Sequence, residues 1–258
     1  MKTSQIAIQF FTLREHTNTL GDFRETCRKV AEIGYQAVQI SAVDYAVIPE
    51  EAMAGICAEN GLTICATHDK PNLILDEPRK VVERLDKLGT RFTAYPAPAG
   101  VDLASEESVA GLIAGLDAAG KVFAEAGKVL AYHNHHHEFR RLDGRLVLER
   151  IYAETGEQNL QGEIDTYWVQ FGGGDPVGWC RCLNGRLPLL HLKDYRINEE
   201  GKPAFAEIGR GNLDIPGIIR AAEESGCEWF IVEQDTCPGD PFESIAASFD
   251  YLKSLAVD

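Results

Sequence analysis

Metal-binding types of side chain follow several short apolar segments of this 258-residue chain. One segment leads into a histidine-rich stretch that contains His133 and Glu138, and three later segments carry Asp165, His191 and Glu233. Apolar runs of this length, bounded by polar residues, indicate buried strands. Four strand ends would then offer one set of imidazole and carboxylate groups: His133 or Glu138, Asp165, His191 and Glu233. This set predicts one divalent metal ion held where the four strands end.

The expected ligands are mostly oxygen atoms. A site made from two glutamates, one aspartate and one histidine suits Mn²⁺, Mg²⁺ or Co²⁺, with Zn²⁺ as a further alternative. No thiolate is among the candidates, which lowers the case for a structural zinc site. Such an ion can polarise a carbonyl or hydroxyl group of a substrate and stabilise an enediolate by its charge. Glutamates beside the substrate could then remove a proton from carbon and return it.

Strand-like and helix-like segments alternate along the whole chain. Strands are expected at residues 5–11, 37–41, 62–67, 91–95, 129–133, 162–165, 187–193 and 229–233. Helices are expected at residues 21–33, 49–60, 77–88, 105–126, 146–154, 175–183, 214–225 and 240–255. This alternation predicts an α/β fold, a (β/α)8 TIM barrel forming a single domain over residues 1–258. The candidate ligands then lie at the carboxyl ends of the strands, where such barrels carry their active sites.

The composition limits the class of partner. A formal net charge of −15 argues against nucleic acid, whose phosphates are bound by clustered Lys and Arg, and against an anionic membrane surface. No apolar run reaches about 18 residues, so no transmembrane helix is expected. The first residues lack a signal-peptide pattern, and seven scattered cysteines without a Cys-x-x-Cys pair fit reduced thiols. We therefore expect a cytoplasmic protein that acts on a small molecule.

Several ordered motifs resemble the sugar phosphate isomerase/epimerase family, which belongs to the xylose-isomerase-like barrels. They are Val-Gln-Ile near the second strand, Tyr-His-Asn-His-x-x-Glu-Phe, Ile-Asp-x-Tyr-Trp, Gly-Asp-Pro-Val, Leu-His-Leu-Lys-Asp-Tyr, Gly-Arg-Gly-Asn-Leu-Asp and Val-Glu-Gln-Asp. The likeness spans nearly the whole chain. The set is specific for the superfamily and poorly specific for the substrate, because relatives include epimerases, isomerases and dehydratases.

The resemblance implies a ligand set: Glu138, Asp165, His191 and Glu233. Mn²⁺ is the ion expected first, and Mg²⁺, Co²⁺ and Zn²⁺ remain alternatives. In related epimerases the two glutamate ligands also act as the acid/base pair, which assigns these roles to Glu138 and Glu233. Glu138 is favoured as the ligand after the fifth strand, and His133, which lies nearer the strand end, is the alternative.

Neighbouring residues are expected to contact the substrate. Lys193 would donate to a developing oxyanion or a hydroxyl group, or instead pair with Asp194 or Asp165. The candidates for substrate binding are His68, His133, His135 and Arg210 for hydroxyl groups and Trp168 for the apolar face of a sugar. Gln39 stands where many relatives place a glutamate, and Gln9 is expected at the bottom of the pocket.

The predicted function is metal-dependent isomerisation or epimerisation of a ketose, keto-sugar or keto-polyol by proton transfer through an enediolate. The main alternative is a lyase or hydrolase on the same scaffold, such as an inosose-type dehydratase or an enzyme that cleaves 3-keto-glycosides. An endonuclease-IV-like nuclease is opposed by the acidic charge, and a non-catalytic sugar-binding barrel is the remaining alternative. The expected partner is a neutral sugar or polyol, and a homo-oligomer is left open.

Overall fold

Eight parallel strands close into a barrel, which confirms the predicted (β/α)8 fold. The computed structural model describes residues 1–257. The barrel strands are β1 (Ile6–Gln9), β2 (Ala37–Ile40), β3 (Thr63–His68), β4 (Phe92–Tyr95), β5 (Val129–His133), β8 (Gln161–Asp165), β9 (Leu189–Leu192) and β12 (Trp229–Val232). The first and last strands pair with each other, with Ile6 opposite Phe230 and Ile8 opposite Val232. This pairing closes the barrel.

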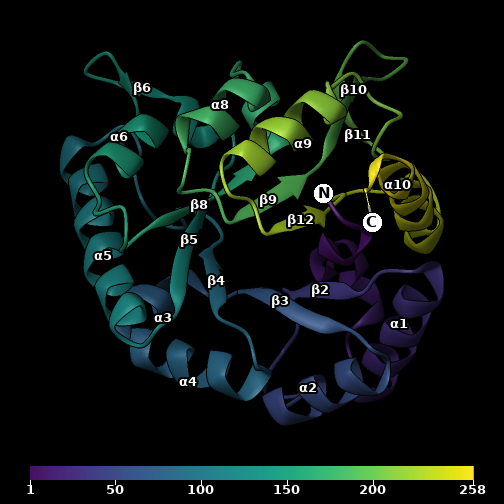
Figure 1. The fold of residues 1–258 in the computed structure, drawn as a ribbon. Helices are drawn as coiled ribbons and strands as arrows, with labels where there is room; N and C mark the ends of the chain where they lie inside the picture. Colours follow the sequence, from purple (N-terminus) through teal and green to yellow (C-terminus); the bar gives the residue numbers. More distant parts are fainter. Residues whose placement is uncertain (258) are drawn as a thin grey trace.

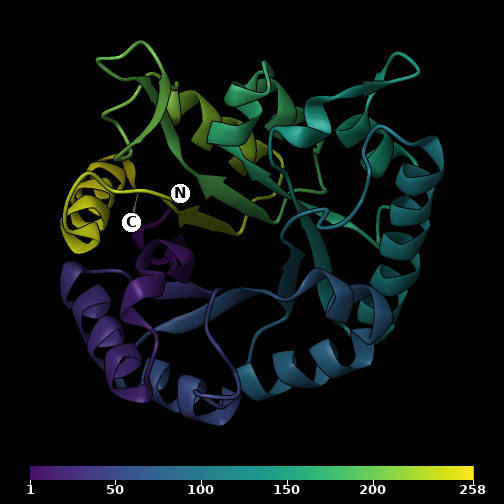
Figure 2. The same ribbon diagram turned by 180° about the vertical axis from the view of Figure 1, so that it is seen from behind.

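Helices form a ring around the strands (Figure 1). They are α1 (Leu20–Ile33), α2 (Glu50–Glu59), α3 (Pro71–Asp76), α4 (Pro78–Leu88), α5 (Glu106–Glu125), α6 (Val147–Ala153), α7 (Thr166–Phe171), α8 (Pro176–Cys182), α9 (Ile215–Glu224) and α10 (Pro241–Leu255). Seen from behind, the last helix, α10, lies beside the first, α1 (Figure 2). Among the described residues, none of these helices has the length and apolar character needed to cross a membrane.

Aspartates set the starts of four helices in the second half of the chain. Each one accepts a hydrogen bond from a backbone N–H of the first turn, which satisfies a group that has no partner within the helix. The four caps are Asp165 for α7, Asp175 for α8, Asp214 for α9 and Asp240 for α10. A proline in the first turn follows three of these caps, as proline is pre-set for that position.

Side chains inside the barrel change from apolar to polar along the strands. Alternate residues of a strand point to the same face. In β9, Leu189 therefore shares the interior with His191, and Leu189 packs in a small interior cluster of apolar residues together with Ala7 and Ile231. Farther toward the carboxyl ends the interior is lined by polar groups such as Gln9 and His191, both fully buried. The apolar layer supports the polar layer from below.

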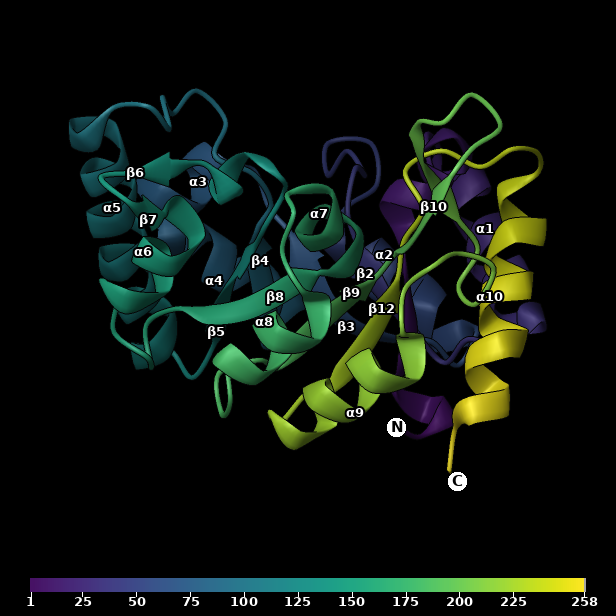
Figure 3. The ribbon, with the colours of Figure 1, turned by 90° about the horizontal axis from the view of Figure 1, so that it is seen from above.

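Two hairpins and several short helices were not expected from the sequence. The loop after β9 forms β10 (Asp194–Ile197) and β11 (Pro203–Ala206), and that after β5 forms η3 (His137–Phe139), β6 (Arg141–Leu142) and β7 (Arg145–Leu146). Short 3₁₀ helices flank β1 at η1 (Thr3–Gln5) and η2 (Phe10–His16), so this strand is shorter than predicted. The β10 hairpin lies at the same end of the barrel as α7, opposite the chain termini (Figure 3).

Candidate metal centre

Four buried side chains meet at the carboxyl ends of neighbouring barrel strands. His133 ends β5, Asp165 ends β8, His191 lies in β9 and Glu233 follows β12. Each offers one atom that could ligate a metal, and these atoms all lie within 4.8 Å of one another. The four strands are consecutive neighbours in the barrel. Strand pairing, rather than a loop, therefore sets the relative positions of the four groups.

The two carboxylate oxygens of Asp165 have different surroundings. Oδ1 accepts a hydrogen bond from the backbone N–H of Trp168 at 2.9 Å and caps helix α7. The buried Oδ2 atom pairs with Lys193 Nζ at 3.0 Å, and within the described residues no hydrogen bond reaches it. This oxygen lies 3.8 Å from His133 Nε2 and 4.0 Å from His191 Nδ1. A buried oxygen that faces two imidazole nitrogens fits a metal ligand, because carboxylate oxygens and imidazole nitrogens can bind the same cation.

Two imidazoles and two carboxylates make this group a mixed nitrogen and oxygen site. His191 Nδ1 lies 2.7 Å from Glu233 Oε2, on the side of the ring that faces Asp165. Imidazole ligands are typical of transition metals, whereas Mg²⁺ favours oxygen atoms and water. The donor set therefore suits Mn²⁺, Co²⁺ or Zn²⁺ better than Mg²⁺.

Glu138 lies outside this group, although the sequence favoured it over His133 as the ligand after the fifth strand. It sits in η3, in the loop after β5, where it is fully buried. Its two oxygens accept hydrogen bonds from the Tyr132 hydroxyl at 2.9 Å and from the backbone N–H of His135 at 3.1 Å. Burial raises the pKa of Glu138 to about 7. The geometry thus favours His133 over Glu138 as the fourth ligand, because strand β5 directs His133 inward and the loop turns Glu138 toward Tyr132.

Lys193 places a buried ammonium group against three carboxylates. Its Nζ atom lies 3.0 Å from Asp165 Oδ2, 2.8 Å from Glu233 Oε2 and 2.8 Å from Asp235 Oδ1. Burial opposes the charge, but the three carboxylates together raise the pKa of Lys193 above its usual range. Of the two ion pairs considered from the sequence, the structure contains the one with Asp165. The Asp194 carboxylate instead accepts backbone N–H groups of the following loop.

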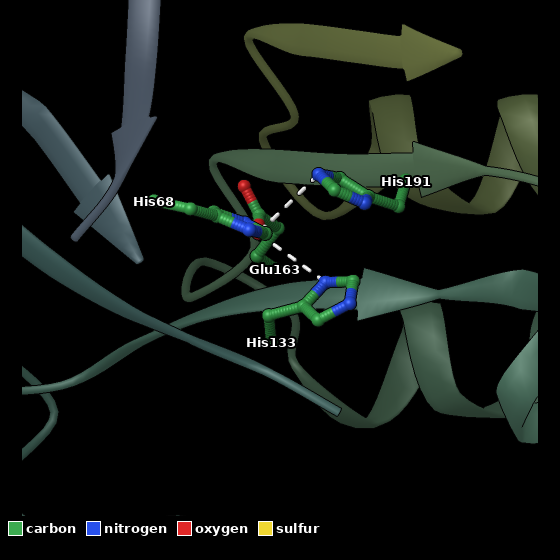
Figure 4. A group of neighbouring side chains, drawn as sticks. All are labelled: His68, His133, Glu163 and His191. Carbon is green, nitrogen blue, oxygen red and sulfur yellow. Dashed lines mark hydrogen bonds and ion pairs between the residues drawn. The ribbon is translucent and has the colours of Figure 1, made fainter. Parts of the chain in front are cut away.

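A second buried group surrounds Glu163, two residues before Asp165 in β8. Its Oε2 atom lies 2.5 Å from His68 Nε2, 3.3 Å from His133 Nδ1 and 3.4 Å from His191 Nε2. The three rings converge on this carboxylate from β3, β5 and β9 (Figure 4). Burial alone would raise the pKa of Glu163, but the histidines around it hold that pKa well below its usual range. The first and second groups share His133 and His191.

Two glutamines continue this polar layer across the barrel. Gln39 Nε2 donates to Glu163 Oε1 at 2.6 Å, and Gln39 Oε1 lies 2.6 Å from His191 Nε2. Gln9 Nε2 donates to the same amide oxygen at 2.8 Å. Gln9 therefore lies deep in the barrel, where it contacts Gln39. It does not line the cavity beside these residues, so its expected place at the bottom of the pocket is not found.

A cavity of about 380 Å³ opens beside the candidate metal centre. Its polar lining includes His68, Asp69, His133, His135, Lys193, Glu233 and Asp235, and its apolar lining includes Phe11, Pro71 and Pro96. This volume and this mixture of apolar walls with a few convergent polar groups are typical of small-molecule sites. Four of the sequence-predicted contact residues, His68, His133, His135 and Lys193, therefore line one cavity.

Trp168 and Arg210 do not line this cavity. The Trp168 ring packs on His135, with centroids 5.4 Å apart, so it supports a residue of the cavity wall. Arg210 is exposed, and its nearest carboxylate is that of Glu207 at 3.9 Å. The expectation that Arg210 binds a substrate hydroxyl finds no support in this position, because the β10–β11 hairpin and its following turn place the side chain in solvent.

Sequence reasoning missed Glu163 and Asp235 as members of the site. A signal for Glu163 was available, because a charged residue in a buried strand, two positions before Asp165, shares the inward face of that ligand. Asp235 comes two residues after Glu233, so the same alternation would place both on one face, although strand β12 itself ends at Val232.

Comparisons with known proteins agree with this architecture. Residues 27–255 match the family model of the xylose isomerase-like TIM barrel. An inosose dehydratase of Geobacillus thermodenitrificans is 29% identical over 159 residues, which is 55% of this chain and 53% of the relative. The chain thus spans about half the length of the curated relatives that it matches.

Solved structures resemble nearly the whole chain. A sugar phosphate isomerase/epimerase of Parabacteroides distasonis superposes with a TM-score of 0.84 at 23% identity, covering 98% of this chain and 95% of the other. An L-ribulose 3-epimerase superposes with a TM-score of 0.76 at 15% identity, covering 96% and 93%. At these identities the likeness establishes the fold. Together with the match over residues 27–255, these findings show that the chain belongs to the xylose isomerase-like TIM barrel family.

Proposed function

We propose that this chain is an isomerase or epimerase that moves protons on a ketose, keto-sugar or keto-polyol with the help of one divalent metal ion. The observation that carries the proposal is the buried Asp165 Oδ2 atom, which faces two imidazole nitrogens at the edge of a sugar-sized cavity. Sugar isomerases and epimerases among the structural neighbours support the same class of substrate.

The ligands would be the four groups that meet at the strand ends: His133, Asp165, His191 and Glu233. When bound, the ion supplies positive charge that polarises a carbonyl or hydroxyl oxygen of the substrate. Mn²⁺ is the ion we expect first, with Co²⁺ and Zn²⁺ next. All four side chains are buried, so little water competes for these positions.

Glu233 is the group that we assign to proton transfer. Burial alone would raise its pKa, but Lys193 and His191 hold the pKa of Glu233 well below its usual range. The side chain is therefore ionised at neutral pH, which is the form that accepts a proton from carbon. In an isomerisation the proton returns to the neighbouring carbon, and one carboxylate at the cavity wall can serve both steps. In an epimerisation the proton must return to the opposite face of the same carbon, which requires a second acid, so this single carboxylate favours isomerisation.

Lys193 and His135 would orient the substrate. Lys193 lines the cavity and donates from a fixed position between Glu233 and Asp235, so it can stabilise negative charge that develops on a substrate oxygen. Burial lowers the pKa of His135 to about 3, which leaves a neutral ring suited to a hydroxyl group. We assign no acid/base role to Glu138, although the sequence led us to expect one. Its two oxygens accept hydrogen bonds from the Tyr132 hydroxyl and from the backbone N–H of His135.

A dehydratase is the second candidate, and the inosose dehydratase relatives favour it. Proton abstraction by Glu233 would be common to both reactions. They differ in the next step, since a dehydratase expels a hydroxyl group as water and an isomerase conserves the mass of the substrate. Mass spectrometry of the product separates the two.

The proposal is tested first by metal content and stability. Untagged protein should contain about one divalent ion per chain, lose it to a chelator and regain thermal stability when Mn²⁺ returns. In Asp165→Asn the Oδ1 cap of α7 is preserved, whereas the charged Oδ2 is lost, so the variant should fold and gain no stability from the ion. Wild-type protein that neither contains nor responds to a divalent ion would overturn the proposal.

Solvent exchange tests the chemistry. In heavy water, the loaded protein should place deuterium on carbon in a keto-sugar that it turns over, and Glu233→Gln should abolish this exchange. The Lys202→Met variant is the matched control, because Lys202 is exposed and pairs with Glu200, which is exposed as well. Exchange that survives in Glu233→Gln would contradict the assigned role.

A further inference from the structure

The carboxylate of Glu163 lies where an acceptor is needed by both histidines of the metal centre. Each imidazole has two nitrogens, and a ring that binds a metal through one of them carries a proton on the other. In this structure His133 Nε2 and His191 Nδ1 face Asp165. The opposite nitrogens, His133 Nδ1 and His191 Nε2, face Glu163 Oε2 at 3.3 and 3.4 Å (Figure 4).

The protonated nitrogen of His191 follows from the orientation of Gln39. An ionised carboxylate can only accept, so Gln39 presents its NH₂ group to Glu163 Oε1, at 2.6 Å. The amide oxygen of Gln39 is then turned away from Glu163 and accepts from Gln9 at 2.8 Å. The same oxygen lies 2.6 Å from His191 Nε2. Because an amide oxygen cannot donate, this nitrogen carries a proton. Nδ1 lies 2.7 Å from the ionised Glu233 carboxylate and donates a second proton to it in the metal-free protein. A metal ion bound at Nδ1 would take the place of that second proton, whereas the proton on Nε2 would stay.

The position of the proton on the His133 ring depends on Glu163 itself, without a residue in between. Within the described residues, its buried Nδ1 atom has no hydrogen bond, and Glu163 Oε2 is the negative charge that faces it. A neutral ring in this position has its lowest energy with the proton on Nδ1, pointing at the carboxylate. The lone pair of Nε2 is then directed at the side where Asp165 lies.

We infer that Glu163 is a positioning residue that fixes which ring nitrogen of His133 and of His191 faces the metal centre. The inference rests on the proposed metal site. It also explains why a carboxylate is buried inside the barrel below the ligands, where it reaches no substrate. A second ion on Glu163 is disfavoured, because it would compete for the ring nitrogens that carry protons when His133 and His191 bind the first ion. Acceptors of this kind orient metal ligands in other proteins, and their loss weakens metal binding.

The test uses Glu163→Gln and Zn²⁺, a diamagnetic probe of the site. The variant should fold and bind Zn²⁺ about 10- to 100-fold more weakly than wild type in competition with a chelator. In the metal-free wild-type protein, ¹⁵N shifts of the ring nitrogens should show the proton of neutral His133 on Nδ1. In the variant, part of the population should carry it on Nε2.

Gln9→Met is the matched control. It removes a buried hydrogen bond from the same polar layer but leaves the contact between Gln39 and Glu163 intact. Its Zn²⁺ affinity and its His133 tautomer should stay as in wild type. An equal loss of affinity in Gln9→Met would overturn the inference, since general damage to the interior would then explain both variants.

Two other results would also overturn it: unchanged Zn²⁺ affinity in Glu163→Gln, or a wild-type His133 that carries its proton on Nε2. The second measurement needs no variant, so the inference stays testable if Glu163→Gln fails to fold. It also needs no metal. A wild-type protein that binds no Zn²⁺ but has the proton on His133 Nδ1 would count against the proposed function alone.

Discussion

The ammonium group of Lys193 lies 2.8 Å from Glu233 Oε2, inside the group of side chains that we assign to the metal. It also lies 3.0 Å from Asp165 Oδ2. A fixed cation of the protein would therefore share two carboxylates with the divalent ion that we propose. The negative charge of the two carboxylates would then be balanced partly by the Lys193 ammonium group, which is always present, and partly by the proposed metal ion, which can dissociate.

Replacing Lys193 should make the protein more dependent on its metal. Lys193→Met keeps the side-chain length but leaves two buried carboxylates and the partly buried Asp235 without their partner, which should destabilise the metal-free protein by about 3–5 kcal/mol. Added Mn²⁺ should then raise the melting temperature more than in wild type. Urea unfolding with chelator and thermal unfolding with Mn²⁺ measure both effects. Lys202→Met, at an exposed pair with Glu200, should cost less than about 1 kcal/mol.

Glu138 should make stability fall as the pH rises. Burial raises its pKa to about 7 in the folded protein, compared with 4.5 for an ordinary glutamate. Between these values the folded chain holds a proton that the unfolded chain has released, so the free energy of unfolding decreases from pH 4.5 to 7 and is level above. The shift corresponds to about 3 kcal/mol.

The glutamine variant isolates this effect. Glu138→Gln cannot ionise, so the difference in unfolding free energy between variant and wild type should move in the variant's favour from pH 5 to pH 8. Urea titrations at the two pH values measure it. Parallel pH profiles for the two proteins would show that Glu138 ionises normally in the folded state.

Asp194 should hold the long loop after β9 in place. Its carboxylate accepts backbone N–H groups of Tyr195, Gly209, Gly211 and Leu213 at 2.8–3.2 Å. Asp194→Ala leaves these donors without an acceptor and should cost about 3 kcal/mol or more. Limited proteolysis should then cut between residues 195 and 213. Resistance equal to that of wild type would mean that the hairpin holds the loop without Asp194.

Two glycines of helix α5 should respond to alanine in opposite directions. A Cβ atom on Gly120 would lie 1.9 Å from the backbone oxygen of Asn159, so Gly120→Ala forces the helix away and should cost about 2 kcal/mol or more. A Cβ on Gly111 meets nothing within 4 Å, and Gly111→Ala should stabilise the protein by about 0.5–1 kcal/mol. Urea unfolding compares both with wild type. Similar values for the two would contradict the close packing at Gly120.

Much of the fold could be predicted from the sequence because alternating periodicity and helix caps are local signals. The barrel, its eight strands and the meeting of Asp165 with His191 follow from them. The loops could not be predicted as well, because the residues of β10 and β11 show no clear alternation of apolar and polar side chains. The position of Arg210 outside the cavity could not be predicted for the same reason, since the path of its loop does not follow from the neighbouring residues.

The choice between His133 and Glu138 as the ligand after the fifth strand shows what local sequence patterns cannot predict. Both residues follow the same strand, and both can ligate a metal. The inward face of β5 continues to His133 by simple alternation, whereas the position of Glu138 depends on the turn formed by η3 and on a hydrogen bond from Tyr132. The same alternation in β8 places Glu163 on the inward face together with Asp165, so Glu163 could also have been predicted from the sequence.

The hydrogen bond from Gln39 to Glu163 has a consequence for how such barrels diversify. A glutamate at position 39 would face the Glu163 carboxylate across a buried contact of 2.6 Å, and two like charges cannot share that place. We therefore expect co-variation across the family: chains with a glutamate at the position of Gln39 should have a neutral residue at that of Glu163. These two facing positions would then carry one carboxylate at a time, at position 39 on β2 or at position 163 on β8, and exchanging the two would require paired substitutions.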